Sequence, residues 1–444
     1  MHITIIGAGL TGLYIGYLLK SINIDFVIYD KSSSPGGRTN TINIFNKISN
    51  CGAEYFYSHH KHMIKLINKL KIRSNTQTTT TTFINLSNPS KPSNLPNSTN
   101  IDQFIIILNK ISSILDLEQP SKNIQTLKYL KLILNPTEIQ ILQIYIPNPE
   151  FLLMPILDFD EYILDDLINK YQTILSPNSI QNNLIKPLGS IKIITDKLAC
   201  IVQEKLFLNH NVEEITYMPH TQKYILTING TFVHTDKVIL ATSASIRKII
   251  LNIPKPIQQS ITNIQPIPII KLFTHHVKSL DKLLKPNHHL QTQGFLTNIK
   301  APTTHILSMN YINDLRTNKL YELLSANPIN KTLINQTLDN LLFEQTKIKF
   351  PPIKDYVFCM WNNGFHINTV PIQTDFFDEY NLILAGEWVH PLHNTLEGSC
   401  MSAIKTFKII KSKLFVDKLI HKPDGVISIE SNRTKFKITN SNLI

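Results

Sequence analysis

Short apolar runs mark the candidate buried strands of this chain. Residues 2–6, 26–29, 238–241 and 382–385 are each almost wholly apolar. Runs of this length, bounded by turn residues, are typical of parallel strands that are covered on both faces. We therefore expect these four segments to share one parallel sheet, although they lie far apart in the sequence.

The segments between these runs have other patterns. Residues 74–100 consist mainly of Thr, Asn, Ser and Pro, which indicates a loop or flexible insertion. Residues 101–176 carry apolar side chains at helical spacing and predict a helical subdomain. Two alternating runs flank Asn229 and Gly230, a pair that predicts a tight β-hairpin.

Composition narrows the class of protein. The 444 residues are 42% hydrophobic, which is enough for two or three globular domains. The net charge of +12 permits anionic partners, but the basic runs lack interleaved aromatic residues, so no nucleic-acid role is expected. No apolar run is long enough to span a membrane and no signal peptide is visible, so we expect a cytoplasmic protein.

Cysteine and histidine spacing gives no metal or disulfide signature. The four cysteines lie far apart without a CxxC pair, which excludes a disulfide scaffold and the usual structural zinc sites and fits a reducing compartment. His59, His60 and His62 form a small cluster, but no Cys, Asp or Glu cluster lies near it in sequence. We expect no metal site and assign the histidines to an exposed loop that enters a helix.

The first motif, Gly7-Ala8-Gly9-Leu10-Thr11-Gly12, follows the first strand and precedes a predicted helix. Its glycines allow a tight turn, close approach of a pyrophosphate, and close packing of helix on strand. Asp30 follows the next strand, 18 residues after Gly12, where a carboxylate can accept from a ribose hydroxyl. The whole βαβ unit predicts nucleotide binding.

Two further motifs fit an extended ligand. Gly36-Gly37-Arg38-Thr39 lets the backbone pass close to a ligand while Arg38 neutralises a phosphate; an ordinary surface turn is the alternative. Gly386-Glu387 precedes Leu396-Glu397-Gly398-Ser399, which predicts a second helix start facing the same ligand. A plain helix start with an acidic first turn is the alternative there.

In this order, and with Gly52-Ala53-Glu54-Tyr55-Phe56 between them, the motifs resemble the FAD-dependent amine oxidase family, of which this chain would be a divergent member. Relatives of that family include protoporphyrinogen oxidase, phytoene desaturases and renalase-like proteins. The resemblance implies an α/β fold: a Rossmann-like FAD-binding domain assembled from non-contiguous segments, with an inserted α+β substrate domain. We expect the FAD domain at 1–73, 185–250 and 381–422, the substrate domain at 74–184 and 251–380, and a polar tail at 423–444.

The resemblance also implies the residues that would hold FAD. Val212 stands where the family places a valine whose backbone meets the adenine, and Thr242 follows a matching strand. The flavin-tethering cysteine of monoamine oxidases has no counterpart near Gly364, so we expect non-covalent FAD. The expected FAD contacts are Gly7, Ala8, Gly9, Leu10, Thr11, Gly12, Asp30, Gly36, Gly37, Arg38, Thr39, Gly52, Ala53, Val212, Thr242, Gly386, Glu387 and Leu396.

Lys271 ends an apolar strand that resembles the family strand carrying an active-site lysine, which holds a water near flavin N5. Outside that context it would be a surface lysine with a buried stem. The family often frames its substrate with two aromatic rings, but Thr395 stands at one of those positions. The candidate pocket residues are therefore Tyr55, Phe365, Trp388 and Thr395.

The resemblance implies oxidation of an amine, with a hydride equivalent passing from the amine α-carbon to flavin N5, oxygen as acceptor and peroxide as product. Glu54 occupies the place where L-amino-acid oxidases carry an arginine, which disfavours an amino-acid substrate and lets Glu54 attract an ammonium or remain solvated. Two alternatives stay open: a flavin oxidoreductase or desaturase for a non-amine substrate, and a catalytically silent FAD-fold binding module. A homodimer is a possible assembly.

Overall fold

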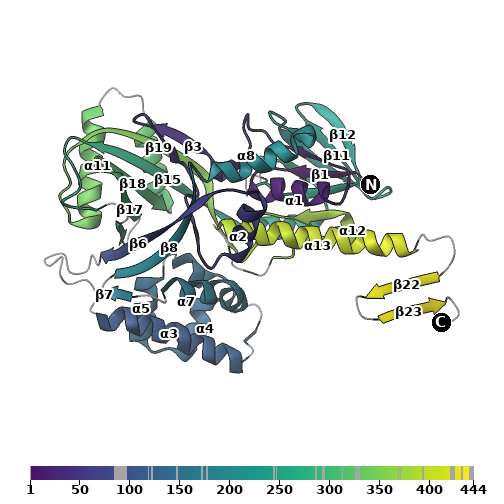
Figure 1. The fold of residues 1–444 in the computed structure, drawn as a ribbon, viewed down its shortest axis with the longest axis horizontal. Helices are drawn as coiled ribbons and strands as arrows, with labels where there is room; N and C mark the ends of the chain where they lie inside the picture. The colour runs from purple at the N-terminus through teal and green to yellow at the C-terminus, as the bar shows by residue number, and fades with distance from the viewer. Residues whose placement is uncertain are drawn as a thin grey trace.

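The protein is described by a computed structural model. It covers residues 2–84, 98–420 and 426–439, apart from gaps at 119, 122–123, 147–148, 172–173, 177–178, 244–245, 247, 286–287, 293–295, 313, 326–330, 369, 371, 393–394 and 432–433. Figure 1 shows helices and a sheet around the N-terminus on one side and a large sheet with its covering helices on the other. A group of helices lies below the large sheet in that view.

The first sheet has the strand order β20-β21-β13-β1-β2-β9, and all its pairs are parallel except β20 with β21. Ile5 on the central strand lies opposite Ile28 on one neighbour and Ile239 on the other. The prediction that the four apolar runs share one parallel sheet is confirmed. The strands are β1 (Ile3–Ile6), β2 (Phe26–Tyr29), β9 (Leu206–Phe207), β13 (Lys237–Leu240), β20 (Asp375–Phe376) and β21 (Leu382–Leu384).

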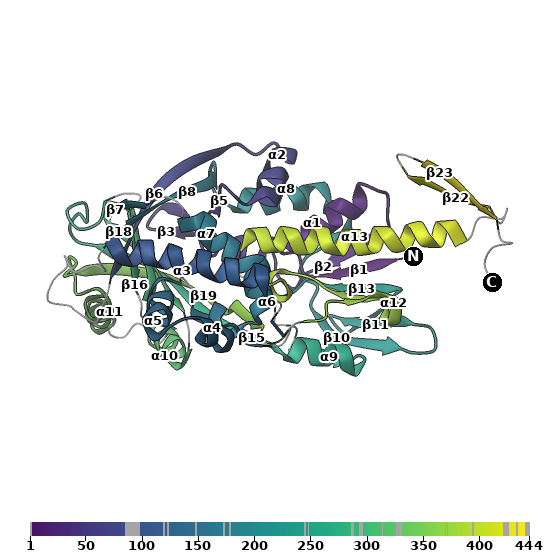
Figure 2. The same cartoon turned by 90° about the horizontal axis from the view of Figure 1, so that it is seen from below.

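Helices cover this sheet and complete its core. Leu13, Leu198 and Ala403, from three helices, are fully buried in one apolar cluster with Ile28 and Ile239. Figure 2 shows the long α13 running beside α1. The helices that contribute are α1 (Leu10–Lys20), α2 (Lys61–Lys69), α8 (Lys192–Ile201) and α13 (Leu396–Ile420), and the short α12 (Phe377–Tyr380) precedes β21.

A smaller sheet has the order β12-β11-β10-β14. The hairpin predicted at Asn229 and Gly230 is confirmed, because Ile228 pairs with Thr231 across it. Both turn residues have positive φ, as this type of two-residue turn requires. The elements are β10 (Val212–Met218), β11 (Lys223–Ile228), β12 (Thr231–Thr235) and β14 (Ile250–Asn252), followed by α9 (Lys255–Thr262).

The third sheet is the large one, with the path β19-β15-β18-β17-β16-β6-β8-β5 and β7 paired to β8. Buried residues of its strands, among them Leu272 and Leu307, pack under α10 (Asp314–Ser325) and α11 (Lys331–Thr346). Its strands are β5 (Phe56–Tyr57), β6 (Ser74–Ile84), β7 (Ile174–Ser176), β8 (Ser179–Pro187), β15 (Ile264–His276), β16 (His288–Thr292), β17 (Leu296–Thr303), β18 (Ile306–Ile312) and β19 (Ile353–Asn368).

Strand β6 corrects the expectation of a loop at 74–100. Residues 74–82 pair with β8 along one edge, and residues 80–84 pair with β16 along the other. The run of threonines there is β-branched, which suits a pleated strand even without apolar periodicity. Residues 85–97 of the predicted loop lie outside the described residues.

The predicted helical subdomain is confirmed as helical over most of 101–176. Its buried side chains, such as Phe104, Leu130 and Tyr145, form a cluster of their own. The helices are α3 (Ser98–Leu117), α4 (Thr126–Ile133), α5 (Pro136–Tyr145), α6 (Ile156–Asp158) and α7 (Asp165–Tyr171). Asn135 caps α5 by accepting from the Glu138 amide at 2.9 Å.

Two hairpins complete the described part of the fold. A hairpin of β3 (Thr41–Ile44) and β4 (Lys47–Asn50) follows the Arg38 motif, and a second, β22 (Val426–Ser431) with β23 (Thr434–Thr439), lies within the predicted polar tail. Figure 1 shows this last hairpin beyond the end of α13, away from the sheets. No helix among the described residues combines the length and the apolar character that crossing a bilayer requires.

Candidate active site

One cavity of about 910 Å³ lies where the first sheet meets the large sheet. Its walls come from both ends of the chain: the Gly7 loop and the first turn of α1 on one side, and the first turn of α13 on another. The Thr11 hydroxyl donates to the Ser399 carbonyl at 3.2 Å, which joins the two helix starts directly. The two motifs predicted to face one ligand therefore share one cavity.

Each glycine of the first motif has a different environment. Gly7 has a φ of +111°, and a Cβ there would lie 2.8 Å from the Ala241 carbonyl oxygen. A Cβ on Gly12 would lie 1.9 Å from the Gly7 carbonyl oxygen, so α1 packs on the turn too closely for any side chain. Gly9 lines the cavity, and a Cβ there would meet nothing within 4 Å. The open side of the loop is therefore at Gly9, where a pyrophosphate could approach the backbone.

The start of α1 has the features of an anion site. Gly9 is the N-cap and provides no side-chain cap, so amides of the first turn stay available to a ligand. Ala8, Leu10 and Thr11 are buried around this turn. Asp30 lines the cavity and accepts from the Ala8 amide at 2.7 Å and from the Ser32 amide at 2.8 Å, which holds its carboxylate at the end of β2.

The second motif lies directly beside this loop, because Gly36 forms an isolated β-bridge with Gly9. Gly36 has a φ of +117°, and its amide donates a hydrogen bond to the Ala8 carbonyl at 2.8 Å. The Thr39 hydroxyl donates to the Gly36 carbonyl at 2.9 Å. Gly37 also lines the cavity, and Arg38 forms an ion pair with Glu387, the acid after Gly386. The guanidinium donates in addition to the Gly364 carbonyl at 3.0 Å, so Arg38 connects both ends of the chain to β19.

Glu387 has a second partner that the sequence analysis missed. His366 of β19 is fully buried and its Nδ1 lies 3.0 Å from a Glu387 carboxylate oxygen. A lone histidine in a strand gave no sequence signal for this contact. The pair fixes Glu387 at the wall of the cavity.

A side chain caps the start of α13. Thr395 lines the cavity, and its hydroxyl accepts from the Gly398 amide at 2.9 Å, so it caps the helix. Leu396 also lines the cavity. Glu397 points away and accepts from the His62 and Met63 amides at 2.9 and 2.8 Å, which caps α2 instead.

The remaining predicted residues divide into two groups. Val212, Thr242, Gly52, Ala53 and Trp388 line the cavity. The Trp388 side chain is 1% exposed, and its indole N–H donates to the Ala385 carbonyl at 2.6 Å, so the ring forms part of the wall.

Among the described residues, Tyr55 does not line this cavity. The Lys300 ammonium lies 5.8 Å from the centre of the Tyr55 ring. Phe365 pairs with Ile267 through the backbone of β19, and its side chain lies outside what the structure describes.

Lys271 lies at the wall where the large sheet closes the cavity. It is 3% exposed, so the alternative of a surface lysine is wrong. Its ammonium donates to the Gly52 carbonyl at 3.3 Å and pairs with one oxygen of Glu54. Burial lowers the pKa of Lys271 to about 7.

Glu54 pairs with a second lysine. The Lys300 ammonium, from β17, contacts the other Glu54 oxygen. Burial lowers the pKa of Lys300 to about 7 as well. The sequence suggested that Glu54 attracts an ammonium or remains solvated. Neither holds, because two lysines of the protein already pair with its carboxylate.

A disulfide joins the two sides of the cavity. Cys51 and Cys359 are bonded across a separation of 308 residues. Cys51 lines the cavity next to Gly52, and Cys359 lies opposite Lys271 in the ladder of β15 and β19. The sequence analysis gave no disulfide signature and indicated a reducing compartment, so this bond was not expected. The fold of the large sheet brings β19 to the end of β4, which the spacing of cysteines along the chain does not reveal.

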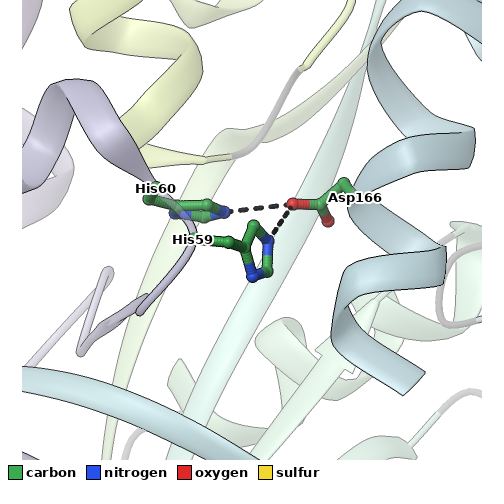
Figure 3. Close-up of side chains that lie close together, drawn as sticks. All are labelled: His59, His60 and Asp166. Carbon is green, nitrogen blue, oxygen red and sulfur yellow. Dashed lines mark hydrogen bonds and ion pairs between the residues drawn. The ribbon is translucent and has the colours of Figure 1, made fainter. Parts of the chain in front are cut away.

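The histidine cluster connects two parts of the fold. His59 and His60 precede α2, and their Nε2 atoms lie 2.8 and 3.1 Å from the same oxygen of Asp166 on α7, as Figure 3 shows. The Tyr57 amide approaches the His60 Nδ1 at 3.4 Å, which favours the tautomer whose Nε2–H donates to Asp166. These groups could also surround a cation, but this tautomer directs a proton, not a lone pair, at the carboxylate.

Burial alone would raise the pKa of Asp166, but the hydrogen bonds from His59 and His60 outweigh it and hold that pKa well below its usual range. The sequence analysis placed the histidines in an exposed loop, whereas His60 is 4% exposed. Asp166 was missed because it lies more than a hundred residues away on another element.

Comparison with known proteins agrees with this geometry. Residues 5–70 match the family model of the NAD(P)-binding Rossmann-like domain. No curated protein matches the sequence. Wild-type putrescine oxidase bound to putrescine is similar in structure, with a TM-score of 0.66 at 13% identity over 93% of this chain and 99% of that chain.

Cyclohexylamine oxidase from Brevibacterium oxydans IH-35A gives a TM-score of 0.65 at 14% identity, over 93% of this chain and 99% of that one. An engineered putrescine oxidase gives 0.67 at 13% identity with the same coverage. The chain shares their fold. It is an α/β protein with a Rossmann-like domain, as expected from the sequence.

Proposed function

We propose that the chain is an FAD-dependent oxidoreductase that oxidises the C–N bond of a small amine. The observation that carries the proposal is the convergence of two helix starts, at Leu10 and Leu396, on one cavity whose opposite wall presents a buried lysine. The similar structures are named as amine oxidases, which supports the reaction class.

The cavity suits a non-covalent dinucleotide. The pyrophosphate would meet the free amides at the start of α1 beside Gly9, and Arg38 would supply a cation from the adjoining turn. Asp30 would accept from the adenosine ribose, and the backbone at Val212 would lie along the adenine. Leu396, Gly386 and Glu387 would border the flavin end, and Lys271 would lie against it. We propose the domain limits given above: an FAD domain at 1–73, 185–250 and 381–422, and a substrate domain at 74–184 and 251–380.

Bound FAD would supply the redox chemistry: it would accept a hydride equivalent from the amine α-carbon and reduce oxygen to peroxide, while the imine product takes up water. The protein's part is binding and orientation. Lys271 would hold a water at the reacting edge of the flavin, and its lowered pKa allows it to accept or release a proton near neutral pH. The substrate amine must be neutral to react, which a buried, water-poor wall favours.

The test is an anaerobic titration of the purified holoprotein with a panel of amines, read from the visible flavin spectrum. The proposal expects bleaching by at least one amine, followed by return of the colour and release of peroxide when oxygen is admitted. Bleaching only by a non-amine reductant would overturn the amine assignment. Bound flavin that no reductant in the panel bleaches would instead indicate a binding module.

A further inference from the structure

Lys300 is a buried lysine to which the proposed reaction assigns no role. It belongs to β17, its side chain is 15% exposed, and it is not among the described residues that line the cavity. Its ammonium pairs with one oxygen of Glu54, while Lys271 pairs with the other. Because Lys271 does line the cavity, Glu54 connects a lysine of the cavity wall to a second lysine outside it.

Both lysines project from one face of the large sheet. Lys271 on β15 lies opposite Asn310 on β18, and Asn310 lies opposite Asn298 on β17. Residues paired across an antiparallel ladder share a face of the sheet, and so do residues two apart on one strand. Lys300 follows Asn298 by two residues, so it shares the face of Lys271, and the two ammonium groups meet at Glu54.

The neighbours of Lys271 on other strands include one more cation. On β19 its ladder partner is Cys359, which is disulfide-bonded and does not titrate. On β8, burial lowers the pKa of Lys186, and the charge of Lys271 lowers it further. The Lys300 ammonium in turn lies 5.8 Å from the centre of the Tyr55 ring. The effect on Lys186 shows that a charge on Lys271 acts on a nearby lysine.

One carboxylate cannot neutralise two ammonium groups. Burial penalises the charged form of each lysine and lowers the pKa of Lys271 and of Lys300 to about 7. Glu54 favours the charged form of the lysine that it pairs with, whereas a charge on one lysine disfavours a charge on the other. Groups coupled in this way lose their protons in steps that belong to the pair. A change at Lys300 should therefore alter the protonation of Lys271.

We propose that Lys300 is a positioning residue for Lys271: by sharing Glu54, a charged Lys300 weakens the hold of Lys271 on its own proton. The proton leaves the Lys271 nitrogen for water in the cavity, and the electron pair of the broken N–H bond stays on that nitrogen. This inference rests on the proposed function for what Lys271 does beside bound FAD, but the coupling of the two lysines does not depend on it.

The experiment follows the titration of Lys271 by NMR of the full chain as purified, labelled with ¹³C at the lysine ε-carbons. Ordinary lysines stay charged from pH 5 to 9, so only lysines with a lowered pKa move, and Lys271→Met identifies the signal of Lys271. Lys300→Met should raise the pKa of Lys271 by at least one unit, because Glu54 then serves Lys271 alone. Lys300→Arg stays charged and should leave that pKa at or below the parent's. The matched control is Lys354→Gln, because Lys354 lies exposed on β19.

A second variant covers the case in which Lys300→Met does not fold. Glu54→Gln removes the shared carboxylate and should lower the pKa of Lys271 below that of the parent. In the holoprotein, the inflection of flavin reoxidation with pH should move upward in Lys300→Met by the same interval as the NMR titration, and it should not move upward in Lys300→Arg.

The outcomes separate the coupling from the reaction. An unshifted Lys271 signal in Lys300→Met would overturn the coupling, and so would an equal upward shift in Lys300→Met and Lys300→Arg, because the charge would then have no part in it. The expected shifts, in a protein whose flavin no amine bleaches, would keep the coupling and overturn the amine oxidase assignment.

Discussion

Gly9 and Gly12 provide a matched pair of substitutions, since they lie in one loop but differ in surroundings. A Cβ on Gly12 would lie 1.9 Å from the Gly7 carbonyl oxygen, whereas ordinary contact begins at 3.4 Å. Gly12→Ala therefore forces α1 and the turn apart by more than an ångström. Overpacking of this kind costs about 1–3 kcal/mol, so we expect the free energy of unfolding of the apoprotein to fall by about 2 kcal/mol.

Gly9→Ala should behave in the opposite way. Its Cβ would meet nothing within 4 Å and its φ of −75° suits alanine. Alanine is a poorer N-cap than glycine but reduces the entropy of the unfolded chain by a comparable few tenths of a kcal/mol, so stability should change by less than about 0.5 kcal/mol. The new methyl group would occupy the approach to the backbone, and we expect FAD to bind at least tenfold more weakly, about 1.4 kcal/mol.

The two variants are compared by urea denaturation of the apoprotein and by fluorescence titration with FAD. The assignment of Gly9 to the open side of the loop would fail if Gly9→Ala bound FAD with the parent's affinity. The assignment of Gly12 to close packing would fail if Gly12→Ala unfolded at the parent's urea concentration.

Three further changes test other parts of the structure. Lys271→Met should slow flavin reoxidation by oxygen and remove an inflection near pH 7 from its pH profile, measured by stopped flow; an unchanged profile would contradict the role of Lys271. Asp166→Asn should lower the free energy of unfolding at pH 7, and that free energy should then fall less steeply as the pH is lowered. A carboxyl with a lowered pKa stabilises the fold fully above its unfolded pKa of about 3.9 and loses that effect as pH falls below it; retention of the parent's acid limb would refute this. Thr395→Ala should cost about 1 kcal/mol through loss of the α13 cap, whereas Thr395→Ser should not, as thermal unfolding would show.

Local patterns predicted the parts of the fold that local interactions determine. The runs around Ile5, Ile28 and Ile239 are apolar because parallel strands are buried on both faces, so composition alone located the first sheet. Asn229 and Gly230 specify a turn through their own backbone preferences. The Thr-rich strand β6 was missed because its composition resembles that of a loop, and its partner strand β8 is far away in the sequence.

The chemistry of the site was only half accessible from the sequence. Lys271 could be found because its strand resembles a known one, but Lys300 carries no motif and comes near Lys271 only because the fold brings both to Glu54. The contact of His366 with Glu387 and the bond between Cys51 and Cys359 likewise depend on where β19 lies. Such contacts are set by tertiary packing, which no short window of sequence encodes.

The buried charges differ between the two ends of the site. At the dinucleotide end, Arg38 and Glu387 form a pair, so the buried charges balance before any ligand arrives. At the large-sheet end, Lys271 and Lys300 share Glu54. A phosphate that approaches Arg38 would share it with Glu387. Burial lowers the pKa of both lysines to about 7, so the charge at the large-sheet end changes near neutral pH.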